Sequence, residues 1–196
     1  KQRLMRNSLL VFFLLSLLFV TGLQCGESIQ APKPRGYFRI DFPEHAYSNF
    51  QPTDCPFSFD VPTYATVVND TDKLKEKCWM NIEFGGYKGT VYLSYRTVNN
   101  DLAQLTDDCR NMAMKHTAKA SAIDESQFID RENHVYGLNY SLKGNAASPV
   151  QFWLTDSTNH FLRGSLYFYA VPNADSIAPV LDFVKEDIRR LIESVR

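Results

Sequence analysis

The chain has 196 residues, of which 44% are hydrophobic and 22% are charged, and its formal net charge is −1. No basic block stands out, so the composition gives little support to nucleic-acid binding. The length suits one domain with a sizeable core. The many Tyr and Phe residues are typical of sheet-rich packing.

The first 24 residues have the three-part plan of a secretory signal peptide. A basic start, KQRLMR, precedes an apolar run from Leu9 to Val20, and the small-residue exit TGLQC ends at Cys25. The apolar run has about 12 residues, whereas a membrane-spanning helix needs roughly 20. We therefore expect residues 1–24 to be a signal peptide rather than a permanent anchor.

Cys25 stands where a bacterial lipoprotein carries its lipid. We expect its thiol to be acylated, with palmitate-like chains that anchor the protein to a membrane. Gln24 departs from the small residue that a lipobox places before the cysteine. The alternative is cleavage near Gly22 or Gln24 and soluble secretion. Residues 25–36 hold Pro and polar side chains and are interpreted as the lipidated cysteine and a tether.

The first half of the remaining chain contains strand patterns. Phe38, Ile40 and Phe42 alternate with polar or amphipathic neighbours, which predicts a strand over 37–42 that ends at Pro43. Alternation or apolar runs bounded by turn residues predict three further strands, at 57–61, 78–84 and 89–98.

The second half changes period. Apolar side chains at helical spacing predict an amphipathic helix over 101–119. Turn signals then separate four strand-like runs, at 122–130, 133–143, 148–156 and 160–171. A final amphipathic helix follows, capped by Ser176 or Asp175, with Pro179 in its first turn.

This order predicts the α+β class. Short turns between consecutive strands favour a largely antiparallel sheet, with the two amphipathic helices covering one or both of its faces. We expect residues 37–196 to form a single domain.

The spacing of the cysteine and histidine residues limits which disulfides and metal sites the chain can form. Export implies an oxidising compartment, and Cys55 and Cys78 each lie beside a strand, so we favour a disulfide between them. Cys109 lies on the apolar stripe of the predicted helix and fits a buried free thiol. Metal binding is the rival interpretation, but no Cys or His pair has ligand spacing, and we predict no metal and no cofactor.

Charged and aromatic side chains interleave most densely over residues 33–47. Tyr and Arg are common anchors of protein interfaces, so this segment is a candidate recognition strip. The alternative is an edge strand whose charges discourage aggregation. The candidate interaction residues are Arg35, Tyr37, Arg39 and Asp41.

Five stretches carry a family resemblance: PKPRGYFRIDFPEHAY (32–47), CPFSFDVPTYA (55–65), CWMNIEF (78–84), KGTVYLSYR (88–96) and SIAPVLDFVKEDI (176–188). In this order they resemble the gliding-motility lipoprotein D family, GldD, of the Bacteroidota. The succession of strands and helices also resembles the PsbP/Mog1 α–β–α sandwich.

The resemblance implies a cell-envelope lipoprotein needed for gliding motility and type IX secretion, acting with other envelope proteins of that machinery. It implies no enzymatic activity, and the expected location is the periplasmic face of the outer membrane. Two alternatives stay open: a periplasmic glycan- or small-ligand-binding lipoprotein with an aromatic-lined cleft, and an envelope hydrolase with an unrecognised site.

Overall fold

The structure is a computed structural model, and it describes residue 36 and residues 39–69 and 77–196. Residues Arg39–Arg196 form one compact unit. The expected signal peptide, Cys25, Arg35 and Tyr37 lie outside the described residues.

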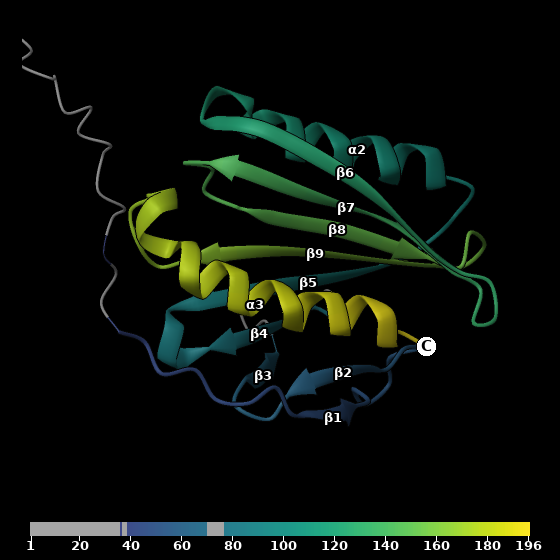
Figure 1. The fold of residues 1–196 in the computed structure, drawn as a ribbon. Coiled ribbons are helices and arrows are strands. Elements are labelled where there is room, and N and C mark those ends of the chain that lie inside the picture. Colours follow the sequence, from purple (N-terminus) through teal and green to yellow (C-terminus); the bar gives the residue numbers. More distant parts are fainter. Residues whose placement is uncertain (1–35, 37–38, 70–76) are drawn as a thin grey trace, which may run out of the picture. The chain divides into compact units, whose positions relative to one another are not determined.

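A seven-stranded sheet forms the centre of this unit (Figure 1). Its strand order is β3-β4-β5-β9-β8-β7-β6, and every neighbouring pair is antiparallel. The last four strands therefore follow one another as the predicted meander. The strands are β3 (Thr66–Asn69), β4 (Met80–Phe84), β5 (Gly89–Thr97), β6 (Ala120–Asp130), β7 (Val135–Gly144), β8 (Val150–Thr155) and β9 (His160–Phe168).

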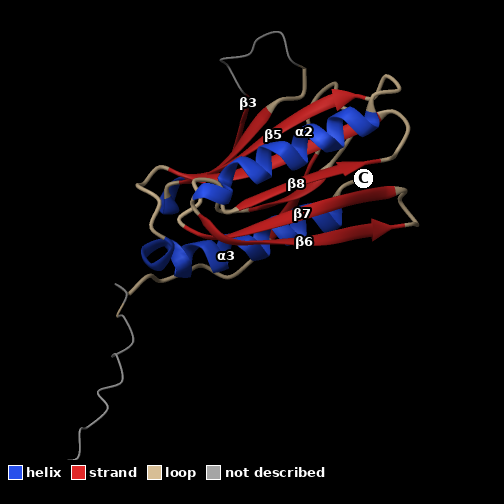
Figure 2. Ribbon diagram, turned by 90° about the horizontal axis from the view of Figure 1, so that it is seen from above, coloured by secondary structure: helices blue, strands red, loops and turns tan. Residues whose placement is uncertain are grey.

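Two helices cover opposite faces of the sheet (Figure 2). Helix α2 (Leu102–Met114) buries Cys109 and Ala113 against one face. Helix α3 (Ala174–Ser194) buries its apolar stripe in the main core on the other face. The α+β prediction is confirmed, and the structure places one helix on each face.

The two faces follow from strand alternation, as β8 illustrates. Phe152 and its neighbours two residues away belong to the same core cluster as α3, whereas Trp153 packs with residues of the α2 side. Gly164 lies opposite Phe152, and a Cβ there would stand 2.1 Å from the Phe152 ring. This glycine therefore makes room for a large core side chain.

The helix ends differ from the sequence prediction. The first helix ends at Met114 and continues as one 3-10 turn, Lys115–Ala118, rather than as an α-helix to residue 119. The last helix begins earlier than expected, because the side chain of Asn173 accepts the backbone N–H of Ser176 and caps it. Pro179 consequently lies beyond the first turn.

The N-terminal part of the unit also differs from the prediction. Residues 39–46 form no strand, so the predicted strand 37–42 is wrong over its described residues. The first strand is instead β1 (Tyr47–Phe50), which pairs with β2 (Phe59–Pro62) in a separate two-stranded antiparallel sheet. The edge strand β3 was not predicted.

Candidate interaction surface

The predicted recognition strip lies at the surface but is not an edge strand. The side chains of Arg39 and Asp41 are 88% and 80% exposed, and they form an ion pair of 2.9 Å with each other. Residues 39–46 are not in a strand and pair with no strand in the described part of the chain, so the edge-strand interpretation does not apply to them. Two of the four candidate residues are thus adjacent and exposed, and the other two lie outside the described part of the chain.

Aromatic side chains hold this segment against helix α3. The ring of Phe42 stacks on Phe183 of α3 with 4.4 Å between centroids, and His45 stacks on the same ring at 4.4 Å. Tyr64 and Tyr87 complete the cluster, each at 5.5 Å from Phe183. The exposed Arg39–Asp41 pair is therefore followed directly by residues that are packed against helix α3.

A buried carboxylate lies beneath these rings. Asp187 of α3 is 1% exposed and accepts three side-chain hydrogen bonds. The donors are Nδ1 of His45 at 2.8 Å, the hydroxyl of Tyr47 at 3.0 Å and the hydroxyl of Tyr64 at 2.7 Å. A buried carboxylate is costly unless it is hydrogen-bonded, and here three donors compensate it. We call these four residues the Asp187 cluster.

The Asp187 cluster holds the segment around His45 and Tyr47 against helix α3. Burial, followed by the hydrogen bond to Asp187, raises the pKa of Tyr47 and of Tyr64 above the ordinary tyrosine value. Both hydroxyls therefore stay protonated and serve as donors. His45 points its Nδ1 at the carboxylate and its ring at Phe183, which fixes its orientation.

The Asp187 cluster was missed by sequence reasoning, although one signal was present. In the last helix Val180, Val184, Ile188 and Leu191 recur at helical spacing, and Asp187 falls on the same stripe. A carboxylate on the apolar face of a helix must accept hydrogen bonds from other side chains or from water, because an unbonded buried charge is costly. The sequence does not say which donors, because they lie more than a hundred residues away.

The small sheet is attached to the same helix. Arg190 of α3 forms an ion pair of 2.6 Å with Asp60 of β2, and its guanidinium lies 5.8 Å from the centre of the Tyr47 ring. The backbone groups of Ser58 and Arg196 exchange two hydrogen bonds, of 3.0 and 3.1 Å. Helix α3 is thus the common support of the segment from residue 39 to β2.

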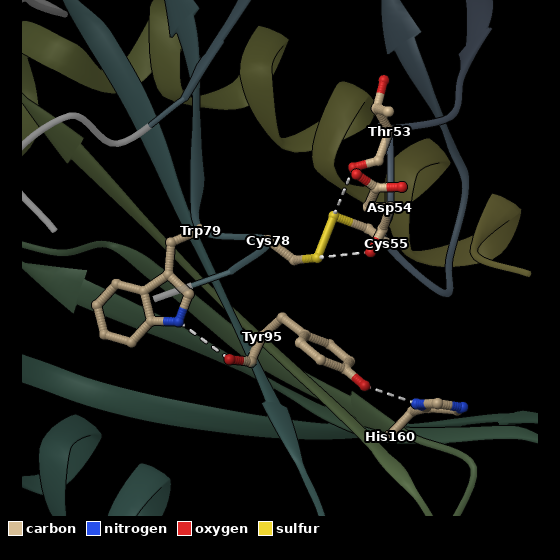
Figure 3. The surroundings of a disulfide bond; sticks show 7 residues. All are labelled: Thr53, Asp54, Cys55, Cys78, Trp79, Tyr95 and His160. Carbon is tan, nitrogen blue, oxygen red and sulfur yellow. Dashed lines mark hydrogen bonds between the residues drawn. A yellow bond between two sulfur atoms is a disulfide. The ribbon is translucent and has the colours of Figure 1, made fainter. Parts of the chain in front are cut away.

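A disulfide joins Cys55 to Cys78, the pairing that the sequence analysis favours (Figure 3). It connects the segment before β2 to the residue pair that leads into β4. The next residue, Trp79, donates its indole N–H to the backbone oxygen of Tyr95 at 3.0 Å. Cys109 is a buried free cysteine, as expected. The cross-link therefore ties the N-terminal segments to the main sheet.

Metal-ligand clusters and membrane-spanning helices are both absent from the described part of the chain. Over residues 39–69 and 77–196, no three His, Cys, Asp or Glu side chains are grouped as metal ligands. None of the helices in that same part of the chain combines the length and apolar character needed to cross a bilayer.

The fold and the surface together define a class: a small α–β–α sandwich that presents an exposed charged segment fastened to its last helix. Among solved structures, the solution structure of cyanobacterial PsbP (CyanoP) from Synechocystis sp. PCC 6803 has this fold. It matches with a TM-score of 0.50 and 10% identity, over 79% of this chain and 94% of that one. At this identity the likeness concerns the fold alone.

The sequence profile of the gliding motility lipoprotein GldD family matches residues 27–196. The chain belongs to this family, as the resemblance of its motifs predicts. The family gives it a role in gliding motility and a membrane-anchored place in the cell envelope. No protein among those with curated functions matches the chain.

Proposed function

We propose that this chain is an outer-membrane lipoprotein, acylated at Cys25 and facing the periplasm, that supports gliding motility and type IX secretion as a non-catalytic assembly or stabilising factor. Its partners would be other envelope proteins of that machinery. Membership of the GldD family supports the motility part of this proposal.

One observation carries the assembly role. The Arg39–Asp41 pair is exposed, yet the segment that follows it is packed on Phe183 and bonded to Asp187. A surface held in place before binding loses less conformational entropy when a partner docks. Exposed charges on such a surface supply specificity through complementary charges. This combination suits a protein contact better than it suits catalysis.

A charge-swapped strain tests the proposal. Replacing Arg39 with Asp and Asp41 with Arg in the chromosome keeps the net charge and the internal ion pair but reverses the pattern that a partner meets. We expect colony spreading and type IX secretion to fall sharply while the protein accumulates at its normal level. The matched control is the same kind of exchange at two exposed residues in the turn after β6, Arg131→Glu together with Glu132→Arg.

Crosslinking supplies the second readout. A photoreactive residue at position 39 should capture envelope proteins from native membranes, and one at position 131 should not. Normal spreading and secretion in the charge-swapped strain would contradict the proposed surface. Normal secretion in a strain that lacks the gene would contradict the secretion role itself.

A further inference from the structure

A cleft of about 450 Å³ opens between helix α2 and the main sheet. Strands β4, β5 and β9 form its floor, and α2 forms one wall. Its polar and aromatic lining includes Trp79, Asn81, Ser94, Arg96, Phe161 and Arg163. The volume lies within the range of small-molecule sites.

The cleft exists because α2 covers only part of this face. The helix packs on the side of β7, β8 and β9, where Ala113 contacts the cluster of Tyr140 and Leu142, and Cys109 contacts Phe161. Residues of β4 and β5 that point to the same face, such as Asn81 and Ser94, are only half-buried. A groove therefore remains beside the helix.

Two guanidinium groups, those of Arg96 and Arg163, line this groove. Over residues 39–69 and 77–196, no acidic side chain lies within ion-pair distance of Arg96 or Arg163. Arg163 donates a hydrogen bond of 3.2 Å to the side chain of Gln151, and Arg96 lies 6.0 Å from the Trp79 ring centre. Asp108, an acid of α2 that also lines the groove, accepts a hydrogen bond of 2.9 Å from the side chain of Gln104. Guanidinium forks match carboxylate and phosphate groups.

The rest of the lining adds aromatic faces and neutral hydrogen-bonding groups. Trp79 follows the disulfide-bonded Cys78, and its indole is bonded to the backbone oxygen of Tyr95 (Figure 3). This bond fixes the orientation of the indole, which lines the groove. Asn81 and Ser94 add an amide and a hydroxyl. A sugar ring presents apolar C–H faces together with polar edges, so aromatic surfaces beside amide and hydroxyl groups suit it.

We propose that this cleft binds a sugar-sized ligand that carries a carboxylate or a phosphate group. Arg163 and Arg96 hold the anionic group, Asn81 and Ser94 bond the polar edge of the ring, and Trp79 contacts its apolar face. The site lies on the α2 face, whereas the proposed protein contact belongs to the segment fastened to α3. Neither function requires the other.

Calorimetric titration of the full-length lipoprotein in detergent micelles tests this site. The probes are N-acetylmuramic acid, which carries a carboxylate, N-acetylglucosamine 6-phosphate, which carries a phosphate, and neutral N-acetylglucosamine. Each is used up to about 10 mM, where a site with a Kd of about 1 mM is nearly full. We expect at least one acidic sugar to bind about tenfold or more tightly than the neutral one, and the acid preferred identifies the anionic group. Added salt should weaken this binding.

Two variants and a control make the result decisive. Arg163→Gln and Arg96→Gln should each weaken binding of the acidic sugar by about tenfold or more. The Arg163→Gln variant loses the hydrogen bond to Gln151, and this loss could unfold the protein. Arg96 is exposed, so the Arg96→Gln variant should stay folded and then provides the test. Arg131→Gln removes the same charge elsewhere and should bind like the parent. The proposal is overturned if neither acidic sugar binds, if all three probes bind equally, or if both arginine variants bind like the parent.

Discussion

The Asp187 cluster gives the sharpest prediction about stability. Replacing Asp187 with Asn keeps the size of the side chain but removes its charge and one acceptor oxygen. His45 and Tyr47 share Oδ1 and would keep a neutral acceptor, while Tyr64 on Oδ2 would face an amide N–H₂. A hydrogen bond to a charged group contributes about 1.5–3 kcal/mol and a neutral one about 1 kcal/mol, so weakening two bonds and losing the third costs roughly 2.5–7 kcal/mol. Because the buried amide avoids the cost of burying a charge, we expect a net loss at the lower end, roughly 2–3 kcal/mol.

Urea unfolding and thermal melting of the purified protein measure this loss. For a domain of this size, roughly 2–3 kcal/mol corresponds to a fall in Tm of about 5–10 °C. The matched control is Asp182→Asn, an exposed acid on the same helix, which should change stability by less than about 0.5 kcal/mol.

A protease adds a local readout, because loosening the segment should speed cleavage after Glu44. The reasoning fails if Asp187→Asn is as stable as the parent. That result would mean that the cost of burying the carboxylate cancels its three hydrogen bonds.

Three further predictions concern other parts of the unit. Replacing both Cys55 and Cys78 with Ala should lower the free energy of unfolding by about 3 kcal/mol, since the disulfide closes a loop with a sequence separation of 23. Thermal melts measure this loss, and added reductant should lower the Tm of the parent but leave the Tm of the double variant unchanged. Burial of Asp156 opposes its ionisation, but backbone N–H bonds prevail and lower its pKa to about 2, so the stability it contributes is present above pH 4 and lost as the pH falls towards 2. When the free energy of unfolding is measured as a function of pH, Asp156→Asn should lose less stability between pH 4 and pH 2 than the parent does. An unchanged acid-dependent loss would mean that other groups cause it. Burial raises the pKa of Cys109 to about 11, so its thiol should react with Ellman's reagent only when the protein unfolds; rapid reaction of the folded protein would contradict this.

Most elements could be predicted because their signals are local. Alternation over β5 and helical spacing over α2 and α3 need only neighbouring residues. The meander of the last four strands also follows from short turns between consecutive strands. The pairing of β5 with β9, which joins the two halves of the sheet, carries no such signal, since the two strands are separated by a helix and three other strands.

The segment before β1 was mispredicted for a physical reason. Alternation over 37–42 fits a strand, but in the described part Phe42 packs on a helix side chain and Ile40 stays exposed. The alternating pattern says that apolar groups seek a partner and does not say whether the partner is a sheet or a helix. The cleft was equally hidden. Arg96 and Arg163 each alternate with apolar neighbours, a pattern typical of any outward-facing strand residue, and only the pairing of β5 with β9 sets them near each other on one face.

The support of the N-terminal segment by helix α3 has a consequence for biogenesis. Asp187, which accepts the hydrogen bond from His45, lies 142 residues later in the chain, so the segment cannot adopt its bonded arrangement until α3 has been synthesised. A chain truncated before α3 would leave three donors without their acceptor and Phe42 without Phe183. Under the proposed function, a partner would therefore bind only a domain that has been synthesised to its end, exported and folded, because only that domain presents an ordered contact surface.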